Sequence, residues 1–319
     1  MIFVIIILSA FFALNMGSAS FAASFAASHG GKVLDKKTSV ILFMIFVALG
    51  AIVLGQRVSV TLGRGLVSSD LINEKAIVII LLTAGLSMFM ANLINIPQST
   101  SLVTVASISG VGFFYHNLNY QMVLFFIPFW ILLPVISFLV TYRVARYIYP
   151  PRNSNFWVYE RIINHESKLK IFIILTSCYN AFSVGTNNVA NVVGPVLNLE
   201  YSLNIFALLL GFGFIYGSGS ILFSKTLTAA SKQIVPLGLM TASIIACVSG
   251  SLMITASYFG VPQSFVMLQM GAIFAVMNVK EGKEAAFGHP IFKKVLYTWT
   301  INPGITFLIS FMASRIFLK

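Results

Sequence analysis

Three asparagines form the densest group of chemically capable side chains in this chain. Asn187, Asn188 and Asn191 fall within SVGTNNVANVVGP (183–195), a segment without charge inside a mostly apolar sequence. In a helix, Asn187 and Asn191 share a face because they are four residues apart, and Asn188 lies beside them. Unpaired amides in apolar surroundings are costly, so such a cluster favours a binding site.

Three further segments carry hydroxyl and amide groups. Ser20, Ser24 and Ser28 recur at a spacing of four, and the segments PQSTS (97–101) and PQS (262–264) have the Pro and Ser that are typical of helix starts. A helix start offers free N–H groups and a positive dipole end, which together bind anions. The predicted anion-binding residues are Ser18, Ser20, Ser24, Gln98, Ser99, Thr100, Ser101, Asn187, Asn188, Asn191, Gln263 and Ser264.

Each of these features also has a purely structural interpretation. The serine stripe, with small residues alongside it, lets two helices approach closely. The proline-led segments suit ordinary capped helices. The binding interpretation is favoured because all four segments occupy repeat-related positions.

The composition predicts an all-α integral membrane protein. Apolar residues make up 58% of the chain, charged residues 9%, and the mean hydropathy is +0.93. Several apolar runs are shorter than the roughly 20 residues of a full span, so we expect extended or broken helices. The runs are 1–14, 40–54, 76–90, 121–140, 203–215 and 301–317.

Internal repetition divides the chain into two related halves. Pro97, Gln98 and Ser99 match Pro262, Gln263 and Ser264 at an offset of 165, and Thr61–Leu62 matches Thr226–Leu227. At an offset of 168, Gly17 matches Gly185 and Ser20 matches Asn188. We expect a first membrane repeat at 1–148, a cytoplasmic linker at 149–168 and a second repeat at 169–319.

The distribution of Lys and Arg predicts the orientation in the cell membrane. With both termini outside and five crossings per half, the inside loops are 32–37, 92–96, 142–170, 218–232 and 278–294, and they hold fifteen of the 20 basic residues. An odd number of crossings makes the repeats inverted, which is typical of secondary transporters. The net charge of +12 is therefore assigned to membrane orientation, and nucleic acid is not an expected partner.

Other classes of protein lack support in the sequence. It contains no pattern typical of a nucleotide-binding loop, a zinc site or a nucleophile elbow, so we expect neither an enzyme nor a cofactor. Cys178 and Cys247 lie in apolar runs and are interpreted as packing residues. A homodimer is a further candidate assembly.

The segment GTNNVANVVGP (185–195) resembles the second copy of the signature of the inorganic phosphate transporter family. IPQSTSLV and VPQSFVML are similar to its proline-led re-entrant hairpins. The resemblance implies that the four segments bind a tetrahedral oxyanion between two inverted repeats, and that paired aspartates help to hold coupling cations.

Both signature aspartates are replaced here. The first signature reads GSASFAAS (17–24) and the second has Asn188, which resembles the sulfate permease branch of the family, the CysP type. Sulfate suits this change, because a dianion without protons only accepts hydrogen bonds and a carboxylate would repel it.

We therefore expect a cation-coupled carrier that imports sulfate, or thiosulfate, by alternating access. The coupling ion, H⁺ or Na⁺, stays open, with the resemblance to the family favouring H⁺. His29 is the nearest titrating group to the serine stripe. A phosphate symporter, a passive anion channel and a non-transporting scaffold are the alternatives.

Overall fold

The chain is described by a computed structural model that covers residues 1–94, 96–199, 204–222 and 238–319. The described residues form helices and connecting turns, as the composition predicts. The helices are α1 (Ile2–Gly30), α2 (Lys36–Val60), η1 (Thr61–Gly65), η2 (Ser69–Leu71), α3 (Glu74–Leu93), α4 (Thr100–Phe114), α5 (Tyr120–Ile148), α6 (Phe156–Asn164), α7 (Glu166–Asn188), α8 (Ala190–Val196), α9 (Ile205–Leu222), α11 (Leu239–Tyr258), α12 (Phe265–Glu281), α13 (Lys283–Gly288) and α14 (Pro290–Phe317).

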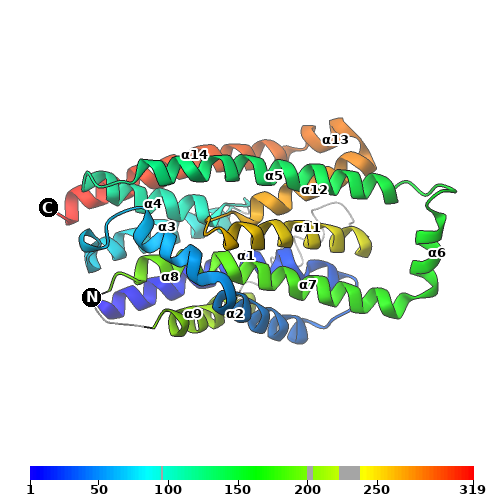
Figure 1. Ribbon diagram of the computed structural model, residues 1–319, viewed down its shortest axis with the longest axis horizontal. Helices are drawn as coiled ribbons and strands as arrows, with labels where there is room; N and C mark the ends of the chain where they lie inside the picture. Colours follow the sequence, from blue (N-terminus) through cyan, green and yellow to red (C-terminus); the bar gives the residue numbers. More distant parts are fainter. Residues whose placement is uncertain (95, 200–203, 223–237) are drawn as a thin grey trace.

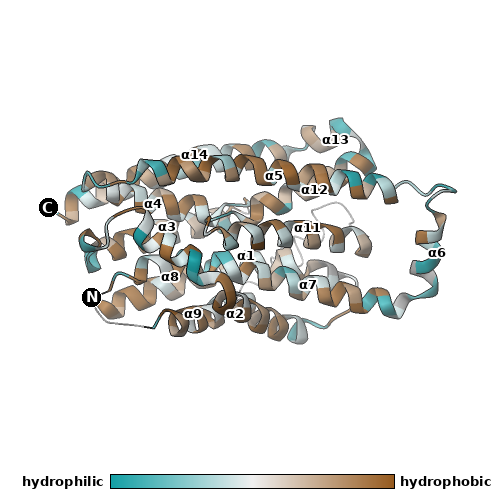
Figure 2. Cartoon of the chain, viewed as in Figure 1, coloured by the Kyte–Doolittle hydropathy of each residue, from teal (hydrophilic) through white to brown (hydrophobic). Residues whose placement is uncertain are grey.

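Seven of the described helices are long and apolar enough to cross a membrane. The protein is thus a multi-pass membrane protein. Its outward-facing side chains are largely apolar, especially on α5 and α14, which suits contact with lipid chains. Figure 2 shows hydrophilic residues gathered at α6, at α13 and at the ends of the bundle.

Both termini lie at one end of the long axis, and α6 lies at the other end (Figure 1). Helix α5 runs toward α6, whereas α7 runs away from it and α14 ends at the C-terminus. The linker and the termini thus occupy opposite ends of the bundle. Which end faces the cytoplasm stays a prediction.

The packing partners of the two halves correspond. Helix α1 packs against α3 and α9, and α7 packs against α11 and α2. Likewise α4 packs against α14, and α12 packs against α5. Exchanging the halves therefore reproduces the main helix pairs, while the inverted orientation of the repeats stays a prediction.

Helices α3 and α4 form a hairpin that ends halfway along the bundle. The N-terminal amino group of Met1 lies 3.8 Å from the Glu74 carboxylate, so α3 begins beside the start of α1. Its last turn reaches only the middle of α1, where Asn92 donates to the Asn15 carbonyl at 3.1 Å. Helix α4 then returns, and Asn119 N–H donates to the carbonyl of Leu66, just ahead of α3.

The second hairpin, α11–α12, starts and ends at the α6 end. The hydroxyls of Tyr149 and Thr241 are 2.9 Å apart at the start of α11, and Lys280, near the end of α12, lies over the same tyrosine ring. The turn between the helices lies beside the interior of α5 and not at either end of it, because the indole N–H of Trp130 donates to the Pro262 carbonyl at 2.7 Å.

These contacts identify the re-entrant hairpins that the proline-led segments predicted. Helices α3 and α4 are the arms of one hairpin, and α11 and α12 are the arms of the other. Helices α3 and α11 are also among the seven that are long enough to cross a membrane. An apolar hairpin arm has the same composition as a crossing helix, so the sequence alone does not separate them. The number of membrane crossings in each half stays a prediction.

The two glycines that hold matching positions in the halves lie inside continuous helices. Gly17 is within α1 and Gly185 is within α7. A Cβ atom at Gly17 would overlap the Tyr216 carbonyl oxygen, and one at Gly185 would overlap the Val47 carbonyl oxygen. Both glycines therefore permit close helix contact, and α7 is joined to α8 at Val189, whose backbone angles remain helical.

Some expectations fall outside the described residues. These are most of the inside loop at 218–232, the match at Thr226–Leu227 and the first residue of the apolar run at 203–215.

Candidate functional site

The predicted polar segments meet at the centre of the bundle. The tips of the two hairpins touch directly, because Ser101 Oγ donates to the Gln263 carbonyl oxygen at 2.9 Å. The junction of α7 and α8, at Val189, lies against both tips, and the middle of α1 completes the cluster through α9. We call this region the polar centre.

Ser20 and Asn188 share one partner. The hydroxyl oxygens of Ser20 and Tyr216 are 2.6 Å apart, and Asn188 Nδ2 donates to the same tyrosine oxygen at 3.2 Å. Tyr216 lies on α9 and is fully buried. This hydroxyl therefore links α1 to α7, two helices from different halves of the chain.

Asn191, in the short helix α8, faces the start of α4. Its Nδ2 lies 3.4 Å from Thr100 Oγ1 and 3.5 Å from Ser101 Oγ, which makes both hydrogen bonds long and weak. Its side-chain carbonyl oxygen is buried and has no hydrogen-bond partner in the described part of the chain. Asn191 is therefore loosely held and available to a ligand.

Asn187 has a different role from its two neighbours. Its Nδ2 donates to Ser257 Oγ and to the Val261 carbonyl, each at 2.9 Å, and its Oδ1 accepts from the Gln263 backbone N–H at 3.0 Å. All three bonds hold the turn between α11 and α12. The amide is thus committed to the shape of this hairpin tip and offers no free donor.

The two hairpin tips present helix starts to the polar centre. Ser99 caps α4 by accepting from Leu102 N–H, and Ser264 caps α12 by accepting from Met267 N–H. The first backbone N–H groups of a helix have no partner within the helix itself. Both helix starts are buried, so these groups and the positive dipole ends point into a region shielded from water.

Not every predicted residue joins the polar centre. Gln98 instead donates to Ser87 at 2.9 Å and accepts from Asn302, both outside the repeat-related segments. Ser18 donates to the Asn15 carbonyl of its own helix. Ser24 is buried with an unpaired hydroxyl. The repeat-related pair of glutamines is thus asymmetric, because Gln263 has neither side-chain polar atom paired.

All twelve predicted residues are at most 4% exposed, so the polar centre is closed to solvent in this conformation. No Asp, Glu, Lys or Arg side chain is among the buried residues that the structure describes. The hollows at the surface, at Gln56–Thr61 and beside α6, lie elsewhere. The polar centre is therefore electrically neutral and consists of hydroxyls, amides and helix starts.

Two amides can serve ligands of either sign. The side-chain oxygens of Asn188 and Asn191 are buried and have no partner among the described residues, and such oxygens suit a cation or a donor. If the Asn188 amide turns by 180°, Tyr216 donates to it and its NH₂ group becomes free for an anion. A hydroxyl both donates and accepts, so this turn preserves the bond.

The described residues contain no cluster of three or more His, Cys, Asp or Glu side chains. His29 is in the last turn of α1, nine residues from Ser20, which is about 14 Å along a helix. A proton carried by His29 would therefore be held outside the polar centre.

Three residues that shape this site carry little or no signal in the sequence. Tyr216 has one weak signal, a lone hydroxyl-bearing ring in the apolar, glycine-rich run GFGFIYGSGS. Ser257 and Trp130 position the α11–α12 turn through long-range bonds and carry no local signal.

A bundle of membrane helices with two re-entrant hairpins meeting at a buried, uncharged polar centre is the architecture of a secondary transporter. The comparisons with known proteins agree. The chain belongs to the phosphate transporter family, which matches residues 16–310.

Relatives within this family carry different names. The sulfate permease CysP of Bacillus subtilis is 30% identical over 98% of this chain and 87% of its own length. A putative phosphate permease of Methanocaldococcus jannaschii is 23% identical over 97% and 96%. A solved structure, the sodium-dependent phosphate transporter, superposes with a TM-score of 0.83 over 98% of both chains at 20% identity, which establishes the shared fold.

Proposed function

We propose that this protein imports sulfate, with thiosulfate as a second substrate, as a cation-coupled carrier that works by alternating access. The observation that carries the proposal is the composition of the polar centre: hydroxyls, amides and two helix starts, with no buried carboxylate among the described residues. The similarity to a sulfate permease over nearly the whole chain supports the same substrate.

Selectivity for sulfate over phosphate depends on the proton that phosphate retains. Sulfate at neutral pH only accepts hydrogen bonds, so donors from helix starts and from Asn188 can satisfy it. Phosphate retains at least one proton and presents a donor. A buried donor that is left unpaired costs about 1 to 3 kcal/mol, which corresponds to roughly five-fold to hundred-fold discrimination.

Phosphate is the second candidate, and a specific observation favours it. The unpaired carbonyl oxygens of Asn188 and Asn191 could accept the phosphate proton if the amides keep their present orientation. The family as a whole and the second relative also carry the name of phosphate.

Alternating access would use the corresponding helix pairs of the two halves. In this scheme the α3–α4 hairpin separates the polar centre from one end of the bundle and the α11–α12 hairpin separates it from the other. Inverted repeats would let each hairpin open in turn while the substrate stays between them.

Import of a dianion must be coupled to cations because of its charge. An inside-negative potential opposes a dianion by about 4.6 kcal/mol per 100 mV, so uphill import needs at least two cations merely to balance charge. Neutral oxygens such as those of Asn188 and Asn191 hold Na⁺ without titrating, whereas H⁺ requires a group such as His29. The geometry of the polar centre favours Na⁺.

Uptake of labelled sulfate by proteoliposomes tests the proposal. A carrier saturates and accumulates label against a gradient, a channel only equilibrates it and a scaffold does neither. Asn188→Ala or Ser99→Ala is expected to lower apparent affinity at least tenfold, since each change removes a group at the polar centre. Near-normal uptake by both variants, at matched expression, would contradict the proposed site.

A further inference from the structure

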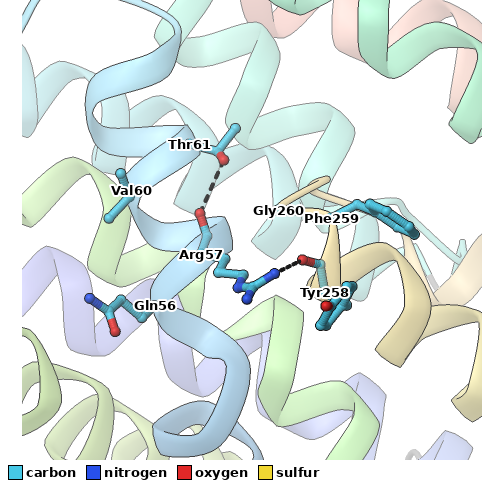
Figure 3. A pocket seen from close by; sticks show the side chains of 7 residues that line it. All are labelled: Gln56, Arg57, Val60, Thr61, Tyr258, Phe259 and Gly260. Atoms are coloured by element: carbon cyan, nitrogen blue, oxygen red, sulfur yellow. Dashed lines mark hydrogen bonds between the residues drawn. The ribbon is translucent and has the colours of Figure 1, made fainter.

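A separate hollow of about 620 Å³ opens at the surface between the end of α2 and the turn after α11 (Figure 3). Gln56, Arg57 and Thr61 line it from the α2 side, and Tyr258 and Gly260 line it from the α11 side. None of these residues belongs to the polar centre. We call this region the outer hollow, because the predicted topology puts it outside the cell.

Arg57 is the charged group of the outer hollow. Its Nη1 donates to the Tyr258 carbonyl at 2.6 Å, and the guanidinium carbon lies 4.4 Å from the centroid of the Tyr258 ring (Figure 3). The ion pair found among the described residues joins Met1 to Glu74, so no described carboxylate neutralises Arg57. A guanidinium has five N–H donors, and most of them remain for an oxyanion.

The outer hollow lies next to the hairpin tip of the second half. Gly260 has a left-handed φ of +69°, and a Cβ there would be 3.0 Å from Thr61 Oγ1, so the turn backbone lies close against η1. Three residues further on is Gln263, whose side chain is unpaired in the polar centre. Three residues span at most about 11 Å, so this turn connects the outer hollow to the polar centre over a short distance.

We propose that the outer hollow is a binding site for a tetrahedral oxyanion on its way to the polar centre, with Arg57 as its charged donor. The identity of the transported anion rests on the proposed function, but the binding chemistry does not. The polar centre contains no formal positive charge, so an arginine at its approach supplies the electrostatic attraction that the centre lacks.

The contacts of Arg57 also allow release. The guanidinium lies at the surface of the described structure and is not enclosed, so an anion bound there can leave again. An oxyanion that takes Nη1 competes with the Tyr258 carbonyl for it, and Tyr258 is the last residue of α11. Occupancy is thus coupled to the segment that leads into the hairpin turn.

The phosphate headgroup of a phospholipid has the same chemistry, and the exposed side chains of Val60 and Phe259 border the outer hollow. We assign the site to the free oxyanion, because its charged and hydroxyl groups lie beside the turn that closes the polar centre.

A binding assay that needs no transport tests the proposal. Val60 is 40% exposed, so Val60→Cys is placed in a Cys178→Ala, Cys247→Ala background and the purified protein is labelled with a neutral maleimide in lipid-free detergent. Sulfate or phosphate, but not chloride at equal ionic strength, is expected to slow labelling at least threefold. Arg57→Gln should raise the oxyanion concentration that gives half-maximal protection at least fivefold. Arg57→Lys, which keeps the charge, should show part of the wild-type protection.

Arg64→Gln is the matched control, because Arg64 is an exposed arginine on η1 that does not line the outer hollow. Labelling that no oxyanion slows, or protection that Arg57→Gln and Arg64→Gln change equally, overturns the proposal. Protection that appears only when anionic phospholipid is added assigns the outer hollow to a lipid headgroup and also overturns it.

Uptake kinetics separate this inference from the proposed function. If the wild-type protein transports neither sulfate nor phosphate, the proposed function fails while the labelling assay still decides the outer site. If it transports, Arg57→Gln should raise KM about fivefold with Vmax retained. If Arg57→Gln instead raises uncoupled leak and leaves protection from labelling unchanged, Arg57 has a structural role in holding α2 to α11, and the proposed binding role is wrong.

Discussion

The hydroxyl oxygens of Ser20 and Tyr216 lie 2.6 Å apart, and Asn188 donates to the same tyrosine oxygen. Ser20 and Asn188 hold matching positions in the two halves of the sequence, yet neither contacts the other directly. One hydroxyl on α9 therefore ties α1 to α7. Any movement of one helix against the other must break or exchange a bond at Tyr216.

Tyr216→Phe is predicted to lower the apparent affinity for sulfate at least tenfold. The change removes the hydroxyl that orients Ser20 and Asn188, and a donor that is no longer aligned with the anion forfeits a hydrogen bond to a charged group, about 1.5 to 3 kcal/mol. Initial rates of labelled uptake across a range of sulfate concentrations provide the measurement. Tyr179→Phe is the control, since that hydroxyl bonds Ser251 away from the polar centre. Equal kinetics for the two variants would show that the Tyr216 bond is irrelevant to transport.

Alanine at Asn187 and at Asn188 should have different consequences. Asn187→Ala removes three bonds that shape the α11–α12 turn and leaves the buried Gln263 N–H unpaired, so the melting temperature should fall. Asn188→Ala should keep the melting temperature and lose affinity. Thermal unfolding in detergent is measured beside uptake. A lower melting temperature for Asn188→Ala alone would reverse the two assigned roles.

Restoring a carboxylate should change the anion preference. Ser20→Asp or Asn188→Asp puts a negative charge in a neutral, buried centre, which should depress sulfate uptake by repulsion and favour a protonated anion. In the wild type, unlabelled selenate and thiosulfate should compete with labelled sulfate, and phosphate should compete poorly between about pH 6 and 8. Phosphate that displaces sulfate as well as selenate does would favour the phosphate carrier.

Sulfate uptake should depend on Na⁺. The polar centre offers the neutral oxygens of Asn188 and Asn191, and the titrating His29 is about 14 Å away along α1. Replacing external Na⁺ by choline at constant pH is expected to abolish accumulation, whereas His29→Gln should leave it largely intact. Accumulation driven by a pH gradient in Na⁺-free buffer, and lost in His29→Gln, would establish protons as the coupling ion.

The α6 end is predicted to face the cytoplasm. Asn155 is unsuitable as a labelling position, because its buried amide bonds the carbonyls of Tyr147, Ile148 and Pro150. Its exposed neighbour Asn153 serves instead, with Ser69 for the other end. Asn153→Cys should react with an impermeant thiol reagent only in opened cells, and Ser69→Cys should react in intact ones. The reverse result would invert the topology.

Much of the architecture followed from composition and repetition. Apolar runs in a chain with 9% charged residues indicate membrane helices whatever their packing, because lipid excludes charge and requires internally paired backbone. The repeated proline-led segments predicted helix starts at the positions where Ser99 and Ser264 cap α4 and α12. Family membership was predicted from the same segments and is confirmed.

The sequence by itself determined which side chains are candidates, because polar residues are conspicuous in an apolar chain. Only the tertiary structure decided what each one does. Asn187 is consumed by the α11–α12 turn, Gln98 is bound to Ser87 and Asn302, and Tyr216 joins Ser20 to Asn188. These partners are between 11 and 204 residues apart, so no local pattern encodes them. Local sequence limits the hydrogen-bonding groups available, whereas the packing of distant helices determines which groups are paired and which remain free for a ligand.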